Sequence, residues 1–465
     1  GFVDTGIETP ELFDLASAFA YEFPPRARAS AFFQELEPSI RNSKRYALLE
    51  GIMHYHSGDL EHAEERFVEA RKLAPDRIRP LLMHVQTLFR LRRRNELPAL
   101  VADLDVSAMH GSALERMHLA QVLAAGGRVD DGLALGFDVI DTHGDDAKVA
   151  LKWLGLCLNH LSRLHELGEA PIGNDMWTRL GTEDGTTTEF WVVGGPGEPS
   201  RRRFGVGHDI ADAARGRAVG DKFEFSDAIG RTVLWTVQQV RHKYLHAYED
   251  LTENFNTRFP TETGFFVVRT VNDDIEPFLD IMRREGERRR KVLDLYTQGP
   301  LPISVIVEMS AGDVVRFTDS LRMLGIPIET CDGTVAERNW GLRTVREHAG
   351  RGVVLDTLTF WALVGMDGLK VVRDVFGPVL LARSTVDDID QLQEDGELVS
   401  GGERTGNAFF HDGQYYFDEL TPERLAAISQ SIAMREQAIH ADCEVVPVRA
   451  PPDADRRILD RLHRG

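Results

Sequence analysis

Apolar residues recur at helical spacing through residues 1–165, and glycine or proline separates one run from the next. The clearest case is a stretch of small residues, one aromatic residue and a proline: Gly51, Ala63, Phe67, Ala70 and Pro75. Small side chains let two antiparallel helices approach closely, and proline cannot continue a helix. Gly58 and Asp59 supply a turn between the two helices. The pattern predicts a helical hairpin.

The hairpin pattern returns along residues 1–165. Further helices are expected over 80–104, 120–140 and 146–164, with a turn at Gly126. The small positions of the first hairpin resemble those of the tetratricopeptide repeat, although His54 stands where that family usually has an aromatic residue. The resemblance implies a short α-solenoid whose concave face receives a protein partner. A plain helical scaffold is the alternative interpretation.

After Pro171 the chain becomes rich in β-branched and aromatic residues. Strands are expected over 186–193, 223–225 and 232–240, and a short helix with glycine turns is expected over 208–221.

The string IADAARGRAVGD, followed by KFEF and GRTVLWTVQQV, resembles the C-terminal domain of the Gre-type transcript cleavage factors. The matching positions are Ile210, Ala211, Gly216, Val219, Gly220 and Asp221, and Arg217 replaces the family's lysine. The resemblance covers residues 172–247 and implies a small α+β, FKBP-like domain. Gre cleavage activity resides in an acidic-tipped coiled coil, and tetratricopeptide-like helices precede the domain here instead. What the resemblance implies is therefore docking on a protein surface such as RNA polymerase, without transcript cleavage.

A helical linker is expected over 248–300, and it carries a basic run: Arg283, Arg284, Arg288, Arg289, Arg290 and Lys291. One interpretation is an RNA-facing patch. The favoured alternative is a solvated helix face whose arginines pair with neighbouring glutamates. The clusters Arg92–Arg94 and Arg201–Arg203 are interpreted in the same way, as solvated loops or helix ends.

Residues 301–465 are expected to form a small α/β connector over 301–340 and then an α/β domain. The apolar runs 352–355 and 378–382 are predicted strands, and each is followed by an acid. Helices are predicted over 359–364, over 369–376 and from Ser384 onward. Strand–helix–helix–strand–helix is the start of a doubly wound sheet, in which ligands bind at the carboxyl ends of the strands.

This pattern resembles a PIN-type nuclease domain. In that family the first strand ends in a metal-binding aspartate, here Asp356, and a second acid lies early in a later helix, here Asp388 or Asp387. The resemblance implies Mg²⁺ or Mn²⁺ as the cofactor, which activates water and stabilises charge on the phosphate. Asp356 is equally expected as a helix N-cap, the commoner role of an aspartate at a strand-to-helix junction.

The later acids of the PIN pattern normally follow a third strand as a pair. After 444–448 the chain offers only Asp453, Asp455 and Asp460, and the sequence ends at Gly465. The domain is therefore expected to be truncated or degenerate, and no catalytic residue is assigned. The lack of an initiator methionine raises the same expectation of a piece of a longer protein.

Net charge, cysteine spacing and the length of the apolar runs exclude some classes of protein. The 465 residues include 54 Lys and Arg against 74 Asp and Glu, a net charge of −20, which argues against a surface devoted to nucleic acid. Cys157, Cys331 and Cys443 are widely spaced and form no zinc motif, as expected of a cytoplasmic protein. No apolar run approaches the roughly 18 to 20 residues that span a bilayer, so no membrane association is expected.

Other candidate chemistry is weak. The glycines at 194–197 and 401–406 lack the lysine or the following helix of a phosphate loop, and the second group is expected to precede a hairpin around Asp412. The pairs His54 with His56, and His242 with His246, have spacings that permit metal ligation. Core or surface histidines are the favoured interpretation of both pairs.

Three hypotheses follow for this order of segments, which resembles a bacterial multidomain architecture with tetratricopeptide-like, Gre-C-like and PIN-like parts. The first is a cytoplasmic assembly protein whose PIN-like end is a metal-dependent ribonuclease. The second is a non-enzymatic interaction scaffold with an incomplete PIN-like domain. The third is a regulator of transcription elongation that binds RNA polymerase.

Overall fold

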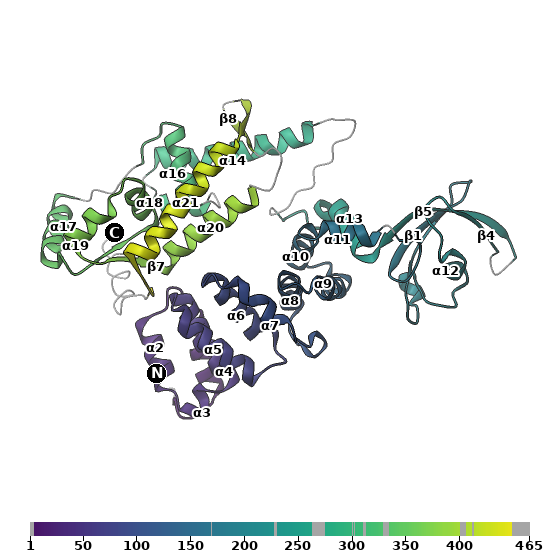
Figure 1. Ribbon diagram of the computed structural model, residues 1–465, viewed down its shortest axis with the longest axis horizontal. Coiled ribbons are helices and arrows are strands. Elements are labelled where there is room, and N and C mark those ends of the chain that lie inside the picture. Colours follow the sequence, from purple (N-terminus) through teal and green to yellow (C-terminus); the bar gives the residue numbers. More distant parts are fainter. Residues whose placement is uncertain are drawn as a thin grey trace. The chain divides into compact units, whose positions relative to one another are not determined.

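A computed structural model describes residues 4–168, 170–226, 230–262, 275–299, 301, 303–309, 313–328, 334–399, 406–411 and 413–448 (Figure 1). The chain divides into two compact units. One is formed by Arg71–Val267, and the other by Gly1–Ala70 together with Val268–Gly465.

The N-terminal helices are α1 (Pro10–Tyr21), α2 (Ala27–Glu35), α3 (Pro38–Arg41), α4 (Lys44–Ser57) and α5 (Leu60–Leu73). Helices α4 and α5 form the predicted hairpin, and Gly58 ends α4 in a left-handed conformation with φ of 79°. Phe67 is fully buried. A Cβ on Gly51 would lie 2.6 Å from the Phe67 ring. The predicted close approach of these two helices is confirmed.

Helices also dominate the first part of Arg71–Val267. They are α6 (Ile78–Arg90), η1 (Arg94–Glu96), α7 (Leu97–Val101), η2 (Val106–Ala108), α8 (Ala113–Ala125), α9 (Val129–His143), α10 (Ala147–Leu158) and α11 (Leu161–Gly168). The expected hairpin around Gly126 is the pair α8 and α9. A later helix, α13 (Lys243–Arg258), buries Tyr244, Leu251 and Phe255 in the same hydrophobic core. The helical core is therefore completed by residues from beyond the sheet.

The sheet of this unit has the order β3-β2-β1-β5-β4. Its elements are β1 (Met176–Gly181), β2 (Thr187–Val192), η3 (Pro199–Arg201), β3 (Arg203–Phe204), α12 (Asp209–Ala214), β4 (Lys222–Ser226) and β5 (Thr232–His242). The β2–β3 pair is parallel and the other pairs are antiparallel, so the sheet is mixed. The three predicted strands are confirmed, whereas β1, the middle strand, and β3 were not expected. In the core of the sheet lie Leu180, Phe190 and Val237.

The glycine-rich turn after α12 is fixed to this sheet. Gly216 and Gly220 both have positive φ, and the Gly220 amide donates to the Val237 carbonyl at 2.8 Å. The Asp221 carboxylate accepts from the Ala218 amide at 2.8 Å. Arg217, in place of the expected lysine, lies over the Phe223 ring at 4.7 Å. The turn is thus held by its own polar and aromatic contacts.

The C-terminal elements are β6 (Val353–Leu355), α18 (Thr357–Gly365), α19 (Leu369–Phe376), β7 (Val379–Ala382), α20 (Arg383–Val399), β8 (Gly406–His411), β9 (Gln414–Glu419), α21 (Pro422–Asp442) and β10 (Cys443–Val446). The strands β10, β7 and β6 form a parallel sheet in that order. The predicted strand–helix–helix–strand–helix order is confirmed. Phe360, Leu381 and Ile389 are fully buried in its core. The expected hairpin is β8 with β9, and Asp412 itself lies outside the described residues.

The segment before this sheet differs from the expected α/β connector. The described residues from 301 to 348 form the helices α15 (Ile303–Met309), α16 (Val314–Met323) and α17 (Val335–His348), whereas α14 (Glu276–Gln298) lies in the expected helical linker. Val315 of α16 joins the core of the parallel sheet. Part of the segment between α14 and β6 thus packs with the α/β domain.

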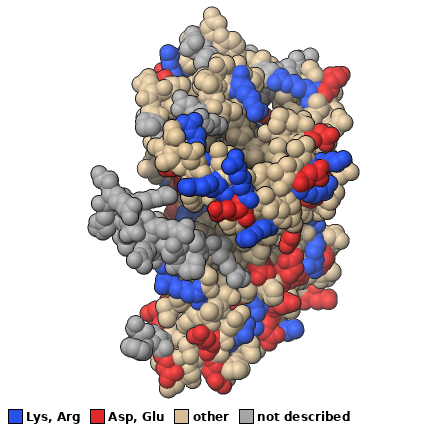
Figure 2. Space-filling model, turned by 90° about the vertical axis from the view of Figure 1, so that its left-hand side faces the viewer, with Lys and Arg blue, Asp and Glu red and all other residues tan. Residues whose placement is uncertain are grey.

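The basic run of α14 is partly paired with acids. Arg283 contacts Glu276 at 3.3 Å and Asp280 at 2.5 Å, and it donates to the Tyr415 hydroxyl at 2.9 Å. Arg288 lies 3.8 Å from Glu285. On the face of the molecule in Figure 2, basic side chains are interspersed with acidic ones. The ion pairs of Arg283 and Arg288 favour the solvated, ion-paired interpretation of the run.

Within the described part of the chain, no helix is both long and apolar enough to cross a bilayer.

Candidate metal site at the strand ends

The predicted acids follow two neighbouring parallel strands. Asp356 comes directly after β6, and α20, which begins directly after β7, carries Asp387 and Asp388 in its second turn. Strands β6 and β7 pair in parallel, with Leu355 opposite Leu381. The carboxyl ends of parallel strands lie at the same edge of a sheet. The fold therefore brings both predicted acidic segments to one edge.

Asp356 is the N-cap of α18, as the alternative interpretation expected. Its Oδ1 accepts from the Thr359 amide at 2.9 Å, and its Oδ2 accepts from the Thr359 hydroxyl at 2.8 Å. The side chain is exposed. Each carboxylate oxygen has a second lone pair, so capping the helix leaves acceptor capacity for a cation.

Asp388 is joined to the end of β6 by a hydroxyl. Thr357, the residue after Asp356, is buried and donates to Asp388 Oδ2 at 2.6 Å. The same hydroxyl lies 3.4 Å from the hydroxyl of the buried Thr385. Thr357 thus ties the first strand end to α20 and fixes one oxygen of Asp388.

Negative charge accumulates around Asp388. Although much of the residue is exposed, its surroundings desolvate the carboxyl group and raise its pKa. Asp387 and Asp313 raise this pKa further, and the Thr357 hydrogen bond lowers it. Asp313 is the N-cap of α16, where its carboxylate accepts from the Arg316 amide at 2.7 Å. A bound cation would stabilise the ionised form of a carboxyl group whose ionisation its neighbours disfavour.

Asp387 is less suited to bind a metal. Its Oδ1 accepts from Arg383 Nε at 3.1 Å, one turn earlier in α20. A guanidinium already supplies the positive charge there. Of the three predicted acids, Asp356 and Asp388 therefore fit a metal better than Asp387.

The residues present fit Mg²⁺ or Mn²⁺ in part. Mg²⁺ keeps several of its waters and binds proteins through one or two carboxylates together with phosphate oxygens, which Asp356 and Asp388 would satisfy. No trio of potential ligands close enough to share one ion lies at this edge within the described residues. The expected later acids Asp453, Asp455 and Asp460 lie outside the described residues.

Sequence reasoning missed Thr357, Thr385 and Asp313. A threonine next to a candidate ligand and an aspartate before the apolar start of a helix were the available signals. Neither signal says which acid the residue would approach.

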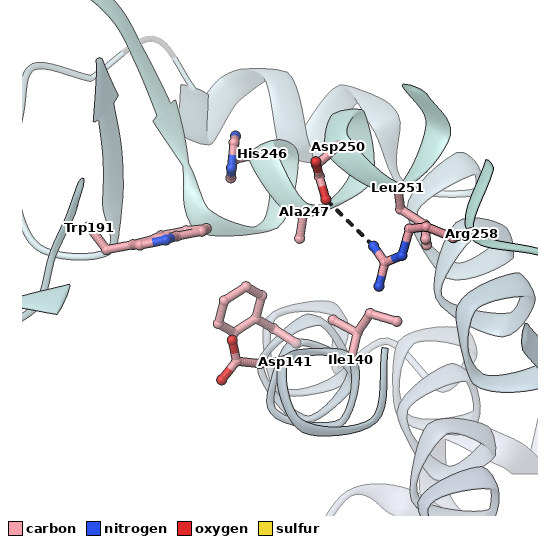
Figure 3. Close-up of a pocket in the computed structure, with 9 residues that line it drawn as sticks. Ile140, Asp141, Trp191, His246, Ala247, Asp250, Leu251 and Arg258 are labelled. Atoms are coloured by element: carbon pink, nitrogen blue, oxygen red, sulfur yellow. Dashed lines mark ion pairs between the residues drawn. The ribbon is translucent and has the colours of Figure 1, made fainter. Parts of the chain in front are cut away.

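A second candidate is a cavity of about 180 Å³ between α9, α13 and β2, whose walls include Phe137, Ile140, Trp191 and Leu251 (Figure 3). Its two aspartates are already paired with arginines. Asp141 pairs with Arg203 and lies 3.5 Å from Arg201. Arg201 and Arg202 are exposed at the end of η3, as expected of a solvated helix end. Asp250 lies 3.6 Å from Arg258. The volume is below the roughly 300 Å³ typical of ligand pockets.

The paired histidines have separate contacts in the structure. His246 stacks on Trp177 with ring centroids 4.0 Å apart, and burial lowers its pKa to about 4. His242 is buried, and its Nδ1 accepts from the Tyr244 amide at 3.4 Å. His56 contacts the Ala20 carbonyl at 2.9 Å, whereas His54 contacts Asp59. The favoured interpretation of these pairs, structural histidines, agrees with the contacts of His56, His242 and His246.

Residues 354–464 match a family model described as the PIN domain associated with the TPR-GreAB-C-PIN system. The match begins within β6 and covers the strand-end acids Asp356, Asp387 and Asp388. It supports the PIN-associated part of the expected architecture. Comparison with curated proteins and with solved structures found no match.

Proposed function

We propose that residues 354–464 act as a metal-dependent ribonuclease module of the PIN type. The observation that carries this proposal is that Asp356 and Asp388 follow neighbouring parallel strands, and that Thr357, the residue after Asp356, donates its hydroxyl to Asp388. The family match over the same residues supports it.

The roles of the side chains follow from their contacts. Asp356 and Asp388 would hold Mg²⁺ or Mn²⁺, which supplies positive charge for the phosphate and lowers the pKa of bound water. Thr357 orients Asp388 by donating to one of its oxygens, which leaves the other oxygen to accept from a ligand. Asp313 adds negative electrostatic potential at Asp388 by its charge.

The remaining segments are proposed to position this module in a bacterial cytoplasmic assembly. The α4–α5 hairpin, with its close approach at Gly51, supports a tetratricopeptide-like surface for a protein partner. The mixed sheet with its ordered turn after α12 supports a Gre-C-like domain that docks on a protein such as RNA polymerase. The third hypothesis, an elongation regulator, rests on this docking alone.

The second candidate function is a non-enzymatic scaffold. One specific observation favours it: Asp356 caps α18 and Asp387 pairs with Arg383, so both carboxylates already have partners. A domain that keeps its fold without a complete metal site would leave the chain as an interaction protein.

An RNA cleavage assay separates the two functions. The full chain is incubated with single-stranded RNA and Mn²⁺, beside the Asp356→Asn/Asp388→Asn variant. The matched control is Asp374→Asn, which changes an exposed aspartate on α19. The nuclease proposal predicts cleavage by the wild type and the control that the double variant loses. No cleavage by any of the three would support the scaffold, and equal cleavage by all three would contradict a catalytic role of these two carboxylates.

A further inference from the structure

The turn of the α4–α5 hairpin carries two histidines and an aspartate. His54 lies in the last turn of α4, Asp59 directly precedes α5, and His62 lies in the first turn of α5. Within the described part of the chain, these three form the only trio of potential metal ligands whose atoms all lie within 4.8 Å of one another. Sequence reasoning considered His54 with His56 and did not consider His62.

The carboxylate of Asp59 bridges the two imidazoles. Its Oδ2 lies 3.0 Å from Nδ1 of His54, and its Oδ1 lies 2.7 Å from Nδ1 of His62. The two rings stack at 5.3 Å with an interplanar angle of 27°. Two nitrogen donors and one oxygen donor therefore converge from both sides of a single turn.

The backbone of the turn is tightly fixed. The Asp59 amide donates to the His54 carbonyl at 3.0 Å, and the Ser57 hydroxyl donates to the same carbonyl at 2.8 Å. The Asp59 carbonyl accepts from the Ala63 amide at 3.0 Å, which begins α5. Gly58 supplies the left-handed residue between the helices. The aspartate is consequently held in one position relative to His54.

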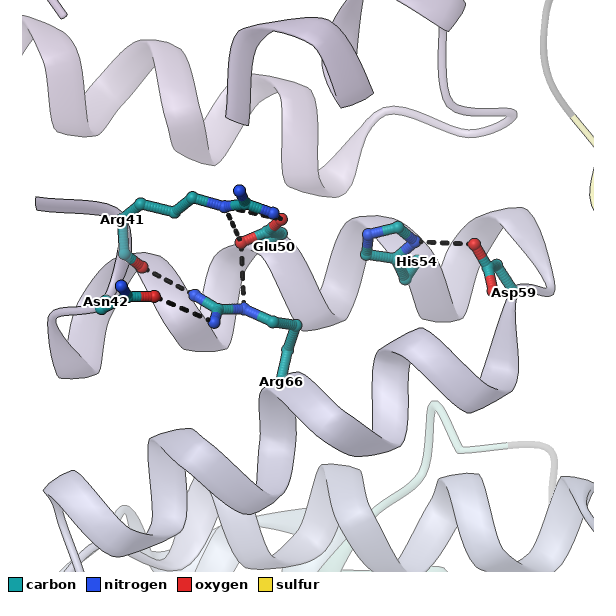
Figure 4. Close-up of polar contacts among 6 residues, drawn as sticks. All are labelled: Arg41, Asn42, Glu50, His54, Asp59 and Arg66. Carbon is teal, nitrogen blue, oxygen red and sulfur yellow. Dashed lines mark hydrogen bonds and ion pairs between the residues drawn. The ribbon is translucent and has the colours of Figure 1, made fainter. Parts of the chain in front are cut away.

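An ion-pair network locks the two helices together one turn away (Figure 4). Glu50, four residues before His54, is buried, and its carboxylate lies 2.9 Å from Arg66 Nε. Arg66 is four residues after His62. Arg41 donates to the same carboxylate at 2.6 Å, and Arg66 donates to the Arg41 carbonyl at 2.7 Å. This network fixes the register that places His54 beside His62.

We propose that His54, Asp59 and His62 bind a transition-metal dication of the Zn²⁺ class. Imidazole and carboxylate are the ligands that Zn²⁺ and its neighbours take up, and three protein ligands leave a fourth position for water or for a group from a partner. Metal–ligand bonds of about 2.1 Å in a tetrahedron place neighbouring ligand atoms about 3.4 Å apart. The two Asp59–imidazole separations, 3.0 and 2.7 Å, are shorter than this, and the exposed His62 side chain can move to lengthen its own.

The type of ligand distinguishes this site from the strand-end acids, although both sites are surrounded by negative charge. Glu61 and Glu65 add negative charge around His62, which favours a cation. Hard Mg²⁺ prefers all-oxygen sites, whereas a site with two imidazoles selects Zn²⁺, Co²⁺ or Ni²⁺. Binding here would not require Asp356 or Asp388.

The test is a titration of the full chain with Zn²⁺ by calorimetry, and with Co²⁺ by visible absorption, in excess Mg²⁺. We expect one tightly bound ion per chain and a Co²⁺ absorption band typical of a low coordination number. His62→Ala should weaken binding by at least about tenfold, because it removes one of three ligands. His62 is 64% exposed, so this change is expected to leave the hairpin folded.

Two further variants make the result decisive. Asp59→Asn keeps a residue type that is favoured before a helix while removing the charged ligand, so it should also weaken binding. His165→Ala removes an exposed histidine of α11, and it should bind as the wild type does. The Asp356→Asn/Asp388→Asn variant should keep the Zn²⁺ site. Equal affinity in the wild type and His62→Ala, or no stoichiometric binding in the wild type, would overturn the proposal and leave a hydrogen-bonded turn.

Discussion

The helix-capping role of Asp356 can be separated from its proposed metal-binding role by two substitutions. Its Oδ1 accepts from the Thr359 amide at 2.9 Å, which satisfies one of the unpaired donors at the start of α18. Replacing an N-cap aspartate by alanine costs about 1 kcal/mol, whereas asparagine caps almost as well as aspartate. Asp356→Ala should therefore destabilise α18 by about 1 kcal/mol. Asp356→Asn should change the stability of α18 by only about a few tenths of a kcal/mol.

Hydrogen exchange measured by mass spectrometry on peptides from α18 is the suitable assay, because it reports local opening. A loss of about 1 kcal/mol corresponds to roughly fivefold faster exchange in Asp356→Ala. Asp356→Asn and the control Asp374→Ala, on α19, should exchange as the wild type does. If asparagine were as damaging as alanine, the capping explanation would be refuted. If alanine had no effect, the hydrogen bond to Thr359 would contribute nothing to α18.

Three other perturbations test the packing and the charges. Gly51→Ala should lower stability by about 1 kcal/mol because its Cβ meets the buried Phe67 ring at 2.6 Å, whereas Gly341→Ala, with nothing within 4 Å, should gain about 0.5–1 kcal/mol in a thermal melt. Asp388 has a raised pKa, so its ionisation disfavours folding. Asp388→Asn should therefore stabilise the chain at pH 7, and this gain should shrink as the pH falls through the folded pKa, as followed by urea unfolding. The pKa of His246 is lowered from 6.5 to about 4 in the folded chain, so protonation favours the unfolded chain as the pH falls across that window. His246→Phe should therefore flatten the dependence of Tm on pH there, and an unchanged slope would contradict the lowered pKa of His246.

Much of the C-terminal fold could be predicted from the sequence because its signals are local. The helix Leu369–Phe376 was expected with the same limits that the structure has, and β7 begins one residue after the expected start at Pro378. Short apolar runs bounded by glycine and proline define such elements without reference to the rest of the chain.

The elements that were missed depend on distant partners. The strand Met176–Gly181 follows Pro171 and a turn at Asn174 and Asp175. It is recognisable as a strand only because β2 and β5 pair with it. Likewise, no local pattern shows that α13 packs on the helices that precede the sheet, since its apolar face suits a linker helix equally well. Helix and strand patterns give the face that is buried, but not what covers it.

In the candidate metal site, too, some residues could be predicted from the sequence and others could not. Asp356 and Asp388 were predicted because parallel strands bring their following residues to one edge. The hydroxyl of Thr357 and the charge of Asp313 were not predicted, because they depend on side-chain direction and on the packing of α16 beside α18. The trio around Asp59 was missed for a related reason: His62 reaches His54 only after the turn has brought α5 back along α4.

The most direct test of the proposed nuclease site is calorimetric titration of the full chain with Mn²⁺, beside the Asp356→Asn/Asp388→Asn variant. Because the histidine cluster around Asp59 also offers ligands, both proteins carry His62→Ala as a common background. The proposed site predicts Mn²⁺ binding that the two asparagines abolish while the α18 exchange rates stay unchanged. Equal binding with and without the two carboxylates, or no binding to either protein, would contradict a metal site at the strand ends.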